Sequence, residues 1–240
     1  SGFWCRTPVQ ARNQVCKSDI NKTRRRYSKH IWYQTLHVGK EEICYQDLYS
    51  SSVYLAGWIN QTVGTGKHII LLSVNNLFFL KIYLAIIKSG NICIPLDPGI
   101  EKENYNYIRD LTEPKMIFLT REVEKRLELN SELSWFPDTL PVAPDTFTPE
   151  APGQEFDKEK CAEIIFTSGS TCKPKGVMIS HKNLIANTSS IVEYLQLTSD
   201  DRMLVVLPFY YCYGLSLLHT HLRVGGSIVF NNSFIFLGGV

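Results

Sequence analysis

The apolar residues in the middle of the chain fall into short runs that are separated by polar turns. One run predicts a buried strand over 69–74, and the stretch 77–88 is apolar nearly all round and predicts a buried helix that stops at Gly90. A second strand is predicted directly afterwards, over 92–95. A strand, a helix and a strand in so short a span predict a right-handed βαβ crossover, and hence a parallel sheet.

Other elements are predicted on both sides of this crossover from the same kinds of spacing. Asn75 or Asn76 can cap the helix over 77–88. The further elements are a helix from Gln46 to about residue 60, a charged helix over 121–129, strands over 162–166 and 177–179, a helix over 181–195 capped by Ser180, a strand that ends at Pro208, a helix over 215–223 and a strand over 227–230. This alternation indicates a layered α/β fold with mainly parallel sheets flanked by helices.

The chain divides into four parts. Residues 1–40 are polar and weakly patterned, and residues 41–129 form a first α/β unit around the βαβ crossover. Residues 130–160 hold five prolines and predict a connection with little regular structure. Residues 161–240 form a second α/β unit, which carries a long polar loop and is expected to stop short of a complete domain.

Composition narrows the class of protein. The chain has 240 residues, of which 44% are apolar and 20% charged, and its formal net charge of +2 argues against a nucleic acid as the main partner. No apolar run reaches the length of a membrane span. The 7 cysteines are scattered, with no CxxC pair and no zinc-site spacing, so no metal site is predicted and a reducing, cytoplasmic setting is favoured.

The longest break in the apolar pattern lies between Phe166 and Val177. It consists of Thr167, Ser168, Gly169, Ser170, Thr171, Cys172, Lys173, Pro174, Lys175 and Gly176. Hydroxyl and backbone N–H donors, glycines that permit close backbone approach, and lysine charges are what a polyphosphate requires. A plain polar hairpin would have a similar composition, so composition alone leaves both interpretations open.

The order of these residues is more specific. The string T-S-G-S-T-C-K-P-K-G-V resembles the phosphate-binding signature T-S-G-[ST]-T-G-x-P-K-G-V of the adenylate-forming superfamily. That superfamily includes acyl-CoA synthetases, adenylation domains of peptide synthetases, D-alanine ligases and luciferases. Cys172 stands where the family signature has glycine. The string is not a Walker A loop, because no Gly-Lys-Ser/Thr triplet closes it.

Two further blocks resemble the same family, in the same order along the chain. Residues 88–98, K-S-G-N-I-C-I-P-L-D-P, resemble the element K-A-G-x-x-x-V-P-L-D-P, in which we interpret Asp97 as architectural. Residues 207–214, L-P-F-Y-Y-C-Y-G, resemble L-P-x-[FY]-H-x-x-G, with Tyr211 at the position of the histidine. His181, in a string S-H-x-N-L that is also similar to the family, is interpreted as a capping or packing residue.

The resemblance covers roughly residues 43–231 and implies a reaction. A carboxylic acid would attack the α-phosphorus of Mg²⁺-bound ATP to give an acyl-adenylate and pyrophosphate. A thiol, from coenzyme A or the phosphopantetheine of an acyl carrier protein, would then take the acyl group. The protein's part in such chemistry is to position the reactants and to neutralise charge on the leaving group.

The resemblance also assigns site residues. Thr167, Ser168, Gly169, Ser170 and Thr171 would cradle the phosphates; Cys172, Lys173 and Gly176 would complete the phosphate loop, and Lys175 would stabilise charge in catalysis. Gly169 and Gly176 would let the loop open and close. The pocket of a small carboxylic acid would be bordered by Tyr210, Tyr211, Tyr213 and Gly214.

Later family motifs do not occur before Val240, namely those that hold magnesium, the ribose and the reacting carboxylate. The resemblance therefore implies an incomplete N-terminal domain of an AMP-forming acid–thiol ligase, inactive or very weak alone. One alternative is a non-catalytic nucleotide-binding or interaction module of the same fold. Another is an unrelated dinucleotide-binding α/β protein, although the G-x-G-x-x-G fingerprint which that class requires is missing.

Overall fold

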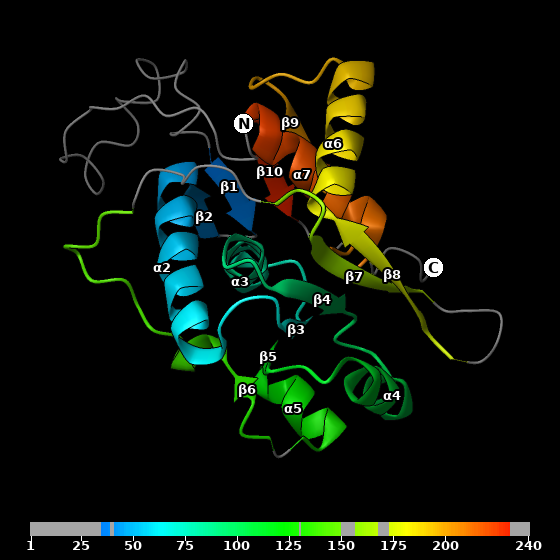
Figure 1. Ribbon diagram of the computed structural model, residues 1–240. Helices are drawn as coiled ribbons and strands as arrows, with labels where there is room; N and C mark the ends of the chain where they lie inside the picture. The colour runs from blue at the N-terminus through cyan, green and yellow to red at the C-terminus, as the bar shows by residue number, and fades with distance from the viewer. Residues whose placement is uncertain (1–34, 39–40, 130, 150–156, 168–172, 231–240) are drawn as a thin grey trace, which may run out of the picture.

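The computed structural model describes residues 35–38, 41–129, 131–149, 157–167 and 173–230, which form two sheets and the helices around them (Figure 1). The α/β class predicted from the sequence, with mainly parallel sheets, is confirmed. Among the described residues, no helix combines the length and the apolar character that crossing a bilayer requires.

The larger sheet is built around the predicted crossover. Its strand order is β6-β5-β3-β4-β7-β8, and every neighbouring pair is parallel except β7 with β8. The strands are β3 (His68–Leu72), β4 (Ile92–Leu96), β5 (Met116–Leu119), β6 (Ser134–Trp135), β7 (Cys161–Thr167) and β8 (Lys175–Ser180). Helix α3 (Leu77–Lys88) joins β3 to β4, and Asn76 caps it by accepting the Phe79 N–H at 2.8 Å.

The smaller sheet joins the beginning of the described chain to its end. Its order is β2-β1-β10-β9, where β1 (Thr35–Val38) and β2 (Glu41–Cys44) form an antiparallel pair. Strand β10 (Ser227–Phe230) runs parallel to both β1 and β9 (Arg202–Val205). Helix α7 (Cys212–Val224) connects β9 to β10. A second parallel crossover thus lies near the end of the described chain.

The remaining helices cover the sheets. They are α2 (Tyr45–Val63), α4 (Lys102–Thr112), α5 (Arg121–Leu127), the short 3₁₀ helix η2 (Pro137–Thr139) and α6 (His181–Leu195). Ile69 and Leu71 of β3 face a core shared with α2, α3 and the smaller sheet, whereas Ile70 and Leu72 face a second core under α4 and α5. The alternation follows from the two-residue repeat of a strand whose two faces are both covered.

Helix α3 lies between the two sheets (Figure 1), which explains why its sequence is apolar nearly all round. Its buried side chains cover most of the circumference of the helix: Phe79, Leu80, Ile82, Tyr83, Leu84, Ala85 and Ile86. The two lysines lie on the remaining strip, where Lys81 is half-buried and Lys88 is exposed. A polar group on the buried part of the helix must bond to the protein.

Several predicted boundaries differ from the structure by a few residues. The antiparallel hairpin extends further than predicted, because Thr167 pairs with Lys175 and β8 therefore begins before residue 177. The smaller differences are that β3 ends at Leu72, α2 continues to Val63 and α5 ends at Leu127. Helix α5 ends there because Glu128 adopts a left-handed conformation, with φ of 51°.

Two larger differences between predicted and observed boundaries lie at the end of β9 and at the start of α7. The strand predicted to end at Pro208 stops at Val205, and the Leu207 carbonyl that follows accepts a side-chain N–H instead of a strand partner. Helix α7 starts at Cys212 and not at residue 215, because the Leu215 N–H reaches the Tyr211 carbonyl at 3.1 Å and closes a first turn. Tyr213, one of the predicted acid-pocket residues, thus lies inside α7.

A fully buried polar network joins α3 to β7 and α7. The Tyr83 hydroxyl donates to Glu163 Oε2 at 2.8 Å, and its oxygen lies 2.7 Å from His219 Nε2. Burial raises the pKa of Glu163 from 4.5 to about 7 and lowers the pKa of His219 from 6.5 to about 4. The neutral forms of both residues are therefore favoured inside the fold, and the hydroxyl of Tyr83 bonds to both.

These opposite shifts predict a pH dependence of stability. Because the pKa of Glu163 is raised on folding, its stabilising contribution is present below pH 4.5 and is lost as the pH rises to about 7. Because the pKa of His219 is lowered, its contribution is present above pH 6.5 and is lost as the pH falls to about 4. Between these limits the two effects oppose each other.

Glu163→Gln removes the effect of Glu163 and keeps that of His219. Wild type loses the Glu163 contribution as the pH rises, whereas the variant never has it. The free energy of unfolding of the variant minus that of wild type should therefore rise by up to about 3 kcal/mol as the pH is raised from about 4 to 7. Chemical denaturation at half-unit pH steps measures this difference. The matched variant His219→Gln should change in the opposite direction, and parallel curves for the two variants would contradict the assignment.

Candidate active site

Three neighbouring parallel strands end at one edge of the larger sheet. Strands β3, β4 and β7 are adjacent, so the residues that follow them lie side by side. The side chains concerned are Asn75 after β3, Asp97 after β4, and Thr167 at the end of β7. The carboxyl edge of a parallel sheet is the usual place for a ligand in α/β proteins.

The predicted phosphate loop connects β7 to β8 at this edge. Its two ends are joined by the pair Thr167–Lys175, and the Thr167 hydroxyl lies 3.4 Å from the Lys175 carbonyl oxygen. The Lys175 side chain is exposed, whereas Lys173 Nζ lies 5.1 Å from the centre of the Tyr107 ring on α4, a cation–π contact. Five predicted loop residues lie outside the described residues: Ser168, Gly169, Ser170, Thr171 and Cys172.

The structure gives a steric reason for glycine at position 176. Gly176 lies inside β8 opposite Phe166, and its expected role in loop opening stays a prediction. A Cβ at this position would lie 2.9 Å from Ile164 Cγ2 and 3.1 Å from Phe166 Cζ. Glycine is therefore needed at position 176 for space beside β7, and the backbone there is ordinary extended strand.

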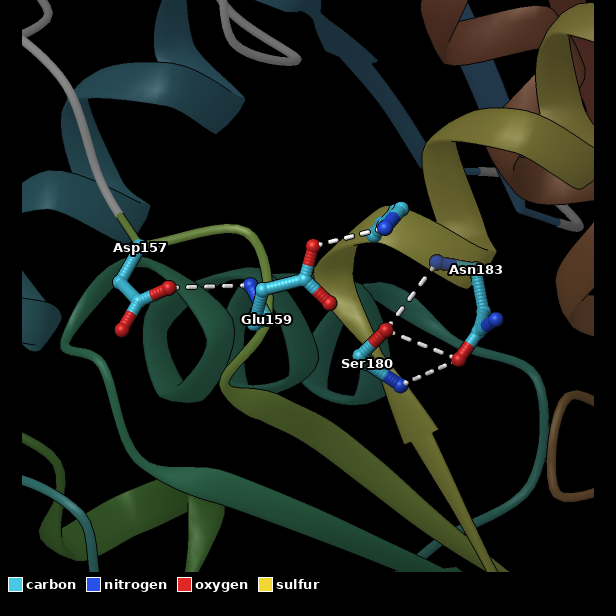
Figure 2. A network of polar contacts seen from close by, with 5 residues as sticks. Asp157, Glu159, Ser180 and Asn183 are labelled. Atoms are coloured by element: carbon cyan, nitrogen blue, oxygen red, sulfur yellow. Dashed lines mark hydrogen bonds and ion pairs between the residues drawn. The ribbon is translucent and has the colours of Figure 1, made fainter.

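The far end of β8 is anchored by α6. The Asn183 N–H donates to Ser180 Oγ at 3.2 Å, and the Ser180 N–H donates to Asn183 Oδ1 at 3.1 Å, which forms a capping box (Figure 2). Lys182, on the first turn of α6, donates a hydrogen bond to Glu159, which precedes β7. The predicted cap at Ser180 is confirmed, and β8 is held at the end opposite to the phosphate loop.

The three predicted acid-pocket tyrosines belong to the segment 207–213, which we call the aromatic segment, and Gly214 follows it directly. Asn75 holds it through two hydrogen bonds: Asn75 Nδ2 donates to the Leu207 carbonyl at 2.9 Å, and the Phe209 N–H donates to Asn75 Oδ1 at 2.8 Å. The Tyr210 hydroxyl lies beside the Asp97 carboxylate. Burial and the nearby Asp97 carboxylate raise the pKa of Tyr210 well above its usual value.

The other aromatic side chains of this segment are accessible. The Tyr210 and Tyr211 rings lie 4.9 Å apart, and Tyr211 and Tyr213 remain 52% and 62% exposed. Gly214 is buried, and a Cβ at this position would lie 2.1 Å from the Pro208 carbonyl oxygen. Glycine at this position lets the first turn of α7 approach the backbone of the aromatic segment.

The sequence did not predict two contacts that hold the aromatic segment, those of Asn75 and Asp97. Asn75 was considered only as a helix cap, but Asn76 makes the cap and Asn75 bonds to the aromatic segment. Asp97 was interpreted as architectural, which fits its bond from the Gly99 N–H at 2.7 Å, yet it also contacts Tyr210. The adjacent pair of asparagines was the available signal, because one helix needs only one cap.

Comparison with known proteins identifies the family. Residues 21–237 match the family described as AMP-binding enzyme. The chain belongs to this family. A D-alanine–D-alanyl carrier protein ligase of Listeria monocytogenes is 29% identical over 195 residues, which cover 78% of this chain and 38% of the relative. A linear gramicidin synthase of Brevibacillus parabrevis is 26% identical over 164 residues, 68% of this chain and 2% of the relative.

Solved structures share the fold of this chain. Apo MatB from Rhodopseudomonas palustris superposes with a TM-score of 0.69 at 22% identity, over 83% of this chain and 42% of that one. The match is to the N-terminal part of the adenylate-forming fold, as the sequence predicted. The chain thus spans about two fifths of the length of MatB and of the D-alanine ligase. In the described part of the chain, no three His, Cys, Asp or Glu side chains gather as a metal site would require.

The close approach at Gly214 predicts a large effect of a small substitution. Gly214→Ala should destabilise the protein by about 1–3 kcal/mol, because the added methyl group forces the first turn of α7 away from Pro208. Gly57→Ala is the control, since Gly57 is exposed within α2 and nothing lies within 4 Å of its added Cβ. That control should stabilise by about 0.5–1 kcal/mol. Urea denaturation measures the free energy of unfolding of both variants, and equal values would contradict the proposed crowding at Gly214.

Proposed function

We propose that this chain forms the phosphate-binding and acid-binding part of an AMP-forming ligase that activates a carboxylic acid with ATP. One observation carries the proposal: in a member of the AMP-binding family, the ends of the phosphate loop and the aromatic segment both lie at the carboxyl edge of β3, β4 and β7. A nucleotide and an acid held at that edge would be adjacent, as acyl-adenylate formation requires.

The phosphate side of the site is proposed to be residues 167–176. Thr167, Ser168, Gly169, Ser170 and Thr171 would supply hydroxyl and backbone N–H donors to the phosphates, with Cys172, Lys173 and Gly176 in the remainder of the loop. The exposed ammonium group of Lys175 would neutralise charge that develops on pyrophosphate as it leaves. These donors and cations suit a polyphosphate but not a bare metal ion, so Mg²⁺ would arrive bound to ATP.

The acid side is proposed to be Tyr210, Tyr211, Tyr213 and Gly214. Their aromatic rings and hydroxyls would border a small-molecule carboxylic acid beside the α-phosphate. Transfer to a thiol would complete the reaction, with coenzyme A or the phosphopantetheine of an acyl carrier protein as acceptor. Relatives named for a D-alanyl carrier protein and for gramicidin synthesis support a carrier. ATP and coenzyme A are cytoplasmic cosubstrates, and we place the reaction in the cytoplasm.

Titration calorimetry with Mg²⁺-bound ATP tests the phosphate side. The wild-type chain should bind, and Lys175→Gln should weaken binding about 10-fold or more, because a charge-assisted contact to phosphate contributes about 1.5–3 kcal/mol. Lys182→Gln is the matched control, since Lys182 is exposed, pairs with Glu159 and lies at the far end of β8. A folded wild-type chain that does not bind ATP would refute the function, whereas binding of ATP without binding of any acyl-adenylate analogue would leave a nucleotide-binding module.

The same titration tests Cys172, at which the family signature has glycine. Cys172→Gly should bind ATP several-fold more tightly if the glycine of the family signature adopts a left-handed conformation, in which a side chain costs about 1–2 kcal/mol. Cys172→Ala serves as the control, because it removes the thiol and keeps the Cβ. An equal gain in Cys172→Ala would assign the effect to the thiol and not to the backbone.

A further inference from the structure

The side chain of Asn75 takes the place of a backbone strand partner. It lies three residues beyond the end of β3 and is 5% exposed. Its carboxamide donates to the carbonyl of Leu207 at 2.9 Å and accepts from the N–H of Phe209 at 2.8 Å. A neighbouring strand makes this same exchange with residues i and i+2. The intervening residue, Pro208, has no N–H to offer.

Only a carboxamide of this length meets both demands. An ionised carboxylate accepts but cannot donate, so an aspartate would place its charge against the Leu207 carbonyl. The neighbouring Asn76 has a different task, because its Oδ1 accepts from the Phe79 N–H and from Ser73 Oγ. Aspartate is as good a helix cap as asparagine. The two adjacent asparagines therefore differ in whether the amide N–H₂ group is used in these contacts.

The bonds of Asn75 fix one end of the aromatic segment, and two further contacts complete its attachment. The Phe209 ring is fully buried and lies 5.4 Å from Phe79 and 5.1 Å from Phe230. Tyr210 then lies beside Asp97, which follows β4. The segment is thereby attached to the ends of β3 and β4, the strands next to β7 and its loop.

We propose that Asn75 is a positioning residue for the carboxylic acid: its carboxamide sets the path of residues 207–209 and so places the tyrosines that border the acid. This inference rests on the proposed function and adds to it a residue outside the family-like motifs. Because both of these bonds go to the backbone of the aromatic segment, their loss should weaken acid binding and spare the binding of ATP.

Asn75→Asp and Asn76→Asp, made in the 240-residue chain, form a matched pair. The probes are Mg²⁺-bound ATP and a set of adenosine 5′-(N-acyl)sulfamates, stable analogues of acyl-adenylates, with D-alanyl, octanoyl and phenylacetyl groups. We expect Asn75→Asp to weaken the best acyl sulfamate at least 10-fold and to change ATP affinity less than 2-fold, which corresponds to the loss of a buried donor. Asn76→Asp should leave both affinities within 2-fold.

Hydrogen exchange at the Phe209 amide gives an independent measure of the same bond. Its protection should fall in Asn75→Asp and stay unchanged in Asn76→Asp. If Asn75→Asp does not fold, Asn75→Ala replaces it, because alanine removes both bonds without burying a charge, and the same split between the probes is expected.

The outcomes separate the two proposals. Equal losses for ATP and acyl sulfamate, or no loss for either, would overturn the positioning role and leave the proposed function standing. A wild-type chain that binds ATP but none of the acyl sulfamates would also overturn it, because no acid site would then exist for Asn75 to position. A wild-type chain that binds neither probe would overturn the proposed function itself.

Discussion

The parallel pairing of β4 with β3 on one side and with β7 on the other is the constraint on which the candidate site depends. Parallel neighbours present their carboxyl ends at the same edge, so the residues after three separate strands meet without any long loop. Antiparallel pairing of β7 would have put the phosphate loop at the opposite edge, away from Asn75 and Asp97. The direction of the strands therefore brings the residues of the candidate site together, whatever their side chains are.

Strand direction depends in turn on α3, the crossover helix between β3 and β4. Its position between the two sheets buries most of its surface, and this explains both its mostly apolar sequence and the bonds of its buried Tyr83 hydroxyl. Glu163 on β7 and His219 on α7 both reach that hydroxyl. The strand that leads to the phosphate loop and the helix that follows the aromatic segment are therefore connected through the core.

Local patterns in the sequence were sufficient for much of the fold. The helix predicted over 77–88 has the observed bounds of α3, and the βαβ crossover follows from its flanking strands. The pairing of β1 with β10 could not be predicted in the same way, because its partners lie almost at opposite ends of the described chain. Pairing at such separation depends on tertiary packing, which leaves no periodic signal in either strand.

The sequence motif predicts the phosphate loop, but it does not show the contacts that position the candidate site. The crowding of Gly176 by Ile164 and Phe166 on the paired strand was not predicted. The contribution of Asn75 depends on a backbone more than 130 residues away. Neither feature follows from neighbours in the sequence, because both require knowledge of which segments lie side by side.

The two halves of the candidate site are carried by different sheets, which bears on how they can move. The predicted phosphate loop extends from the larger sheet, whereas the aromatic segment follows β9 of the smaller sheet. Asn75 connects the segment to the larger sheet through two hydrogen bonds, Tyr210 lies beside Asp97, and the Phe209 ring packs on α3 and β10. The contact of Lys173 with Tyr107, by comparison, is a single cation–π interaction of about 1 kcal/mol. The aromatic segment is therefore attached more firmly to the larger sheet than the Lys173 side chain is to α4.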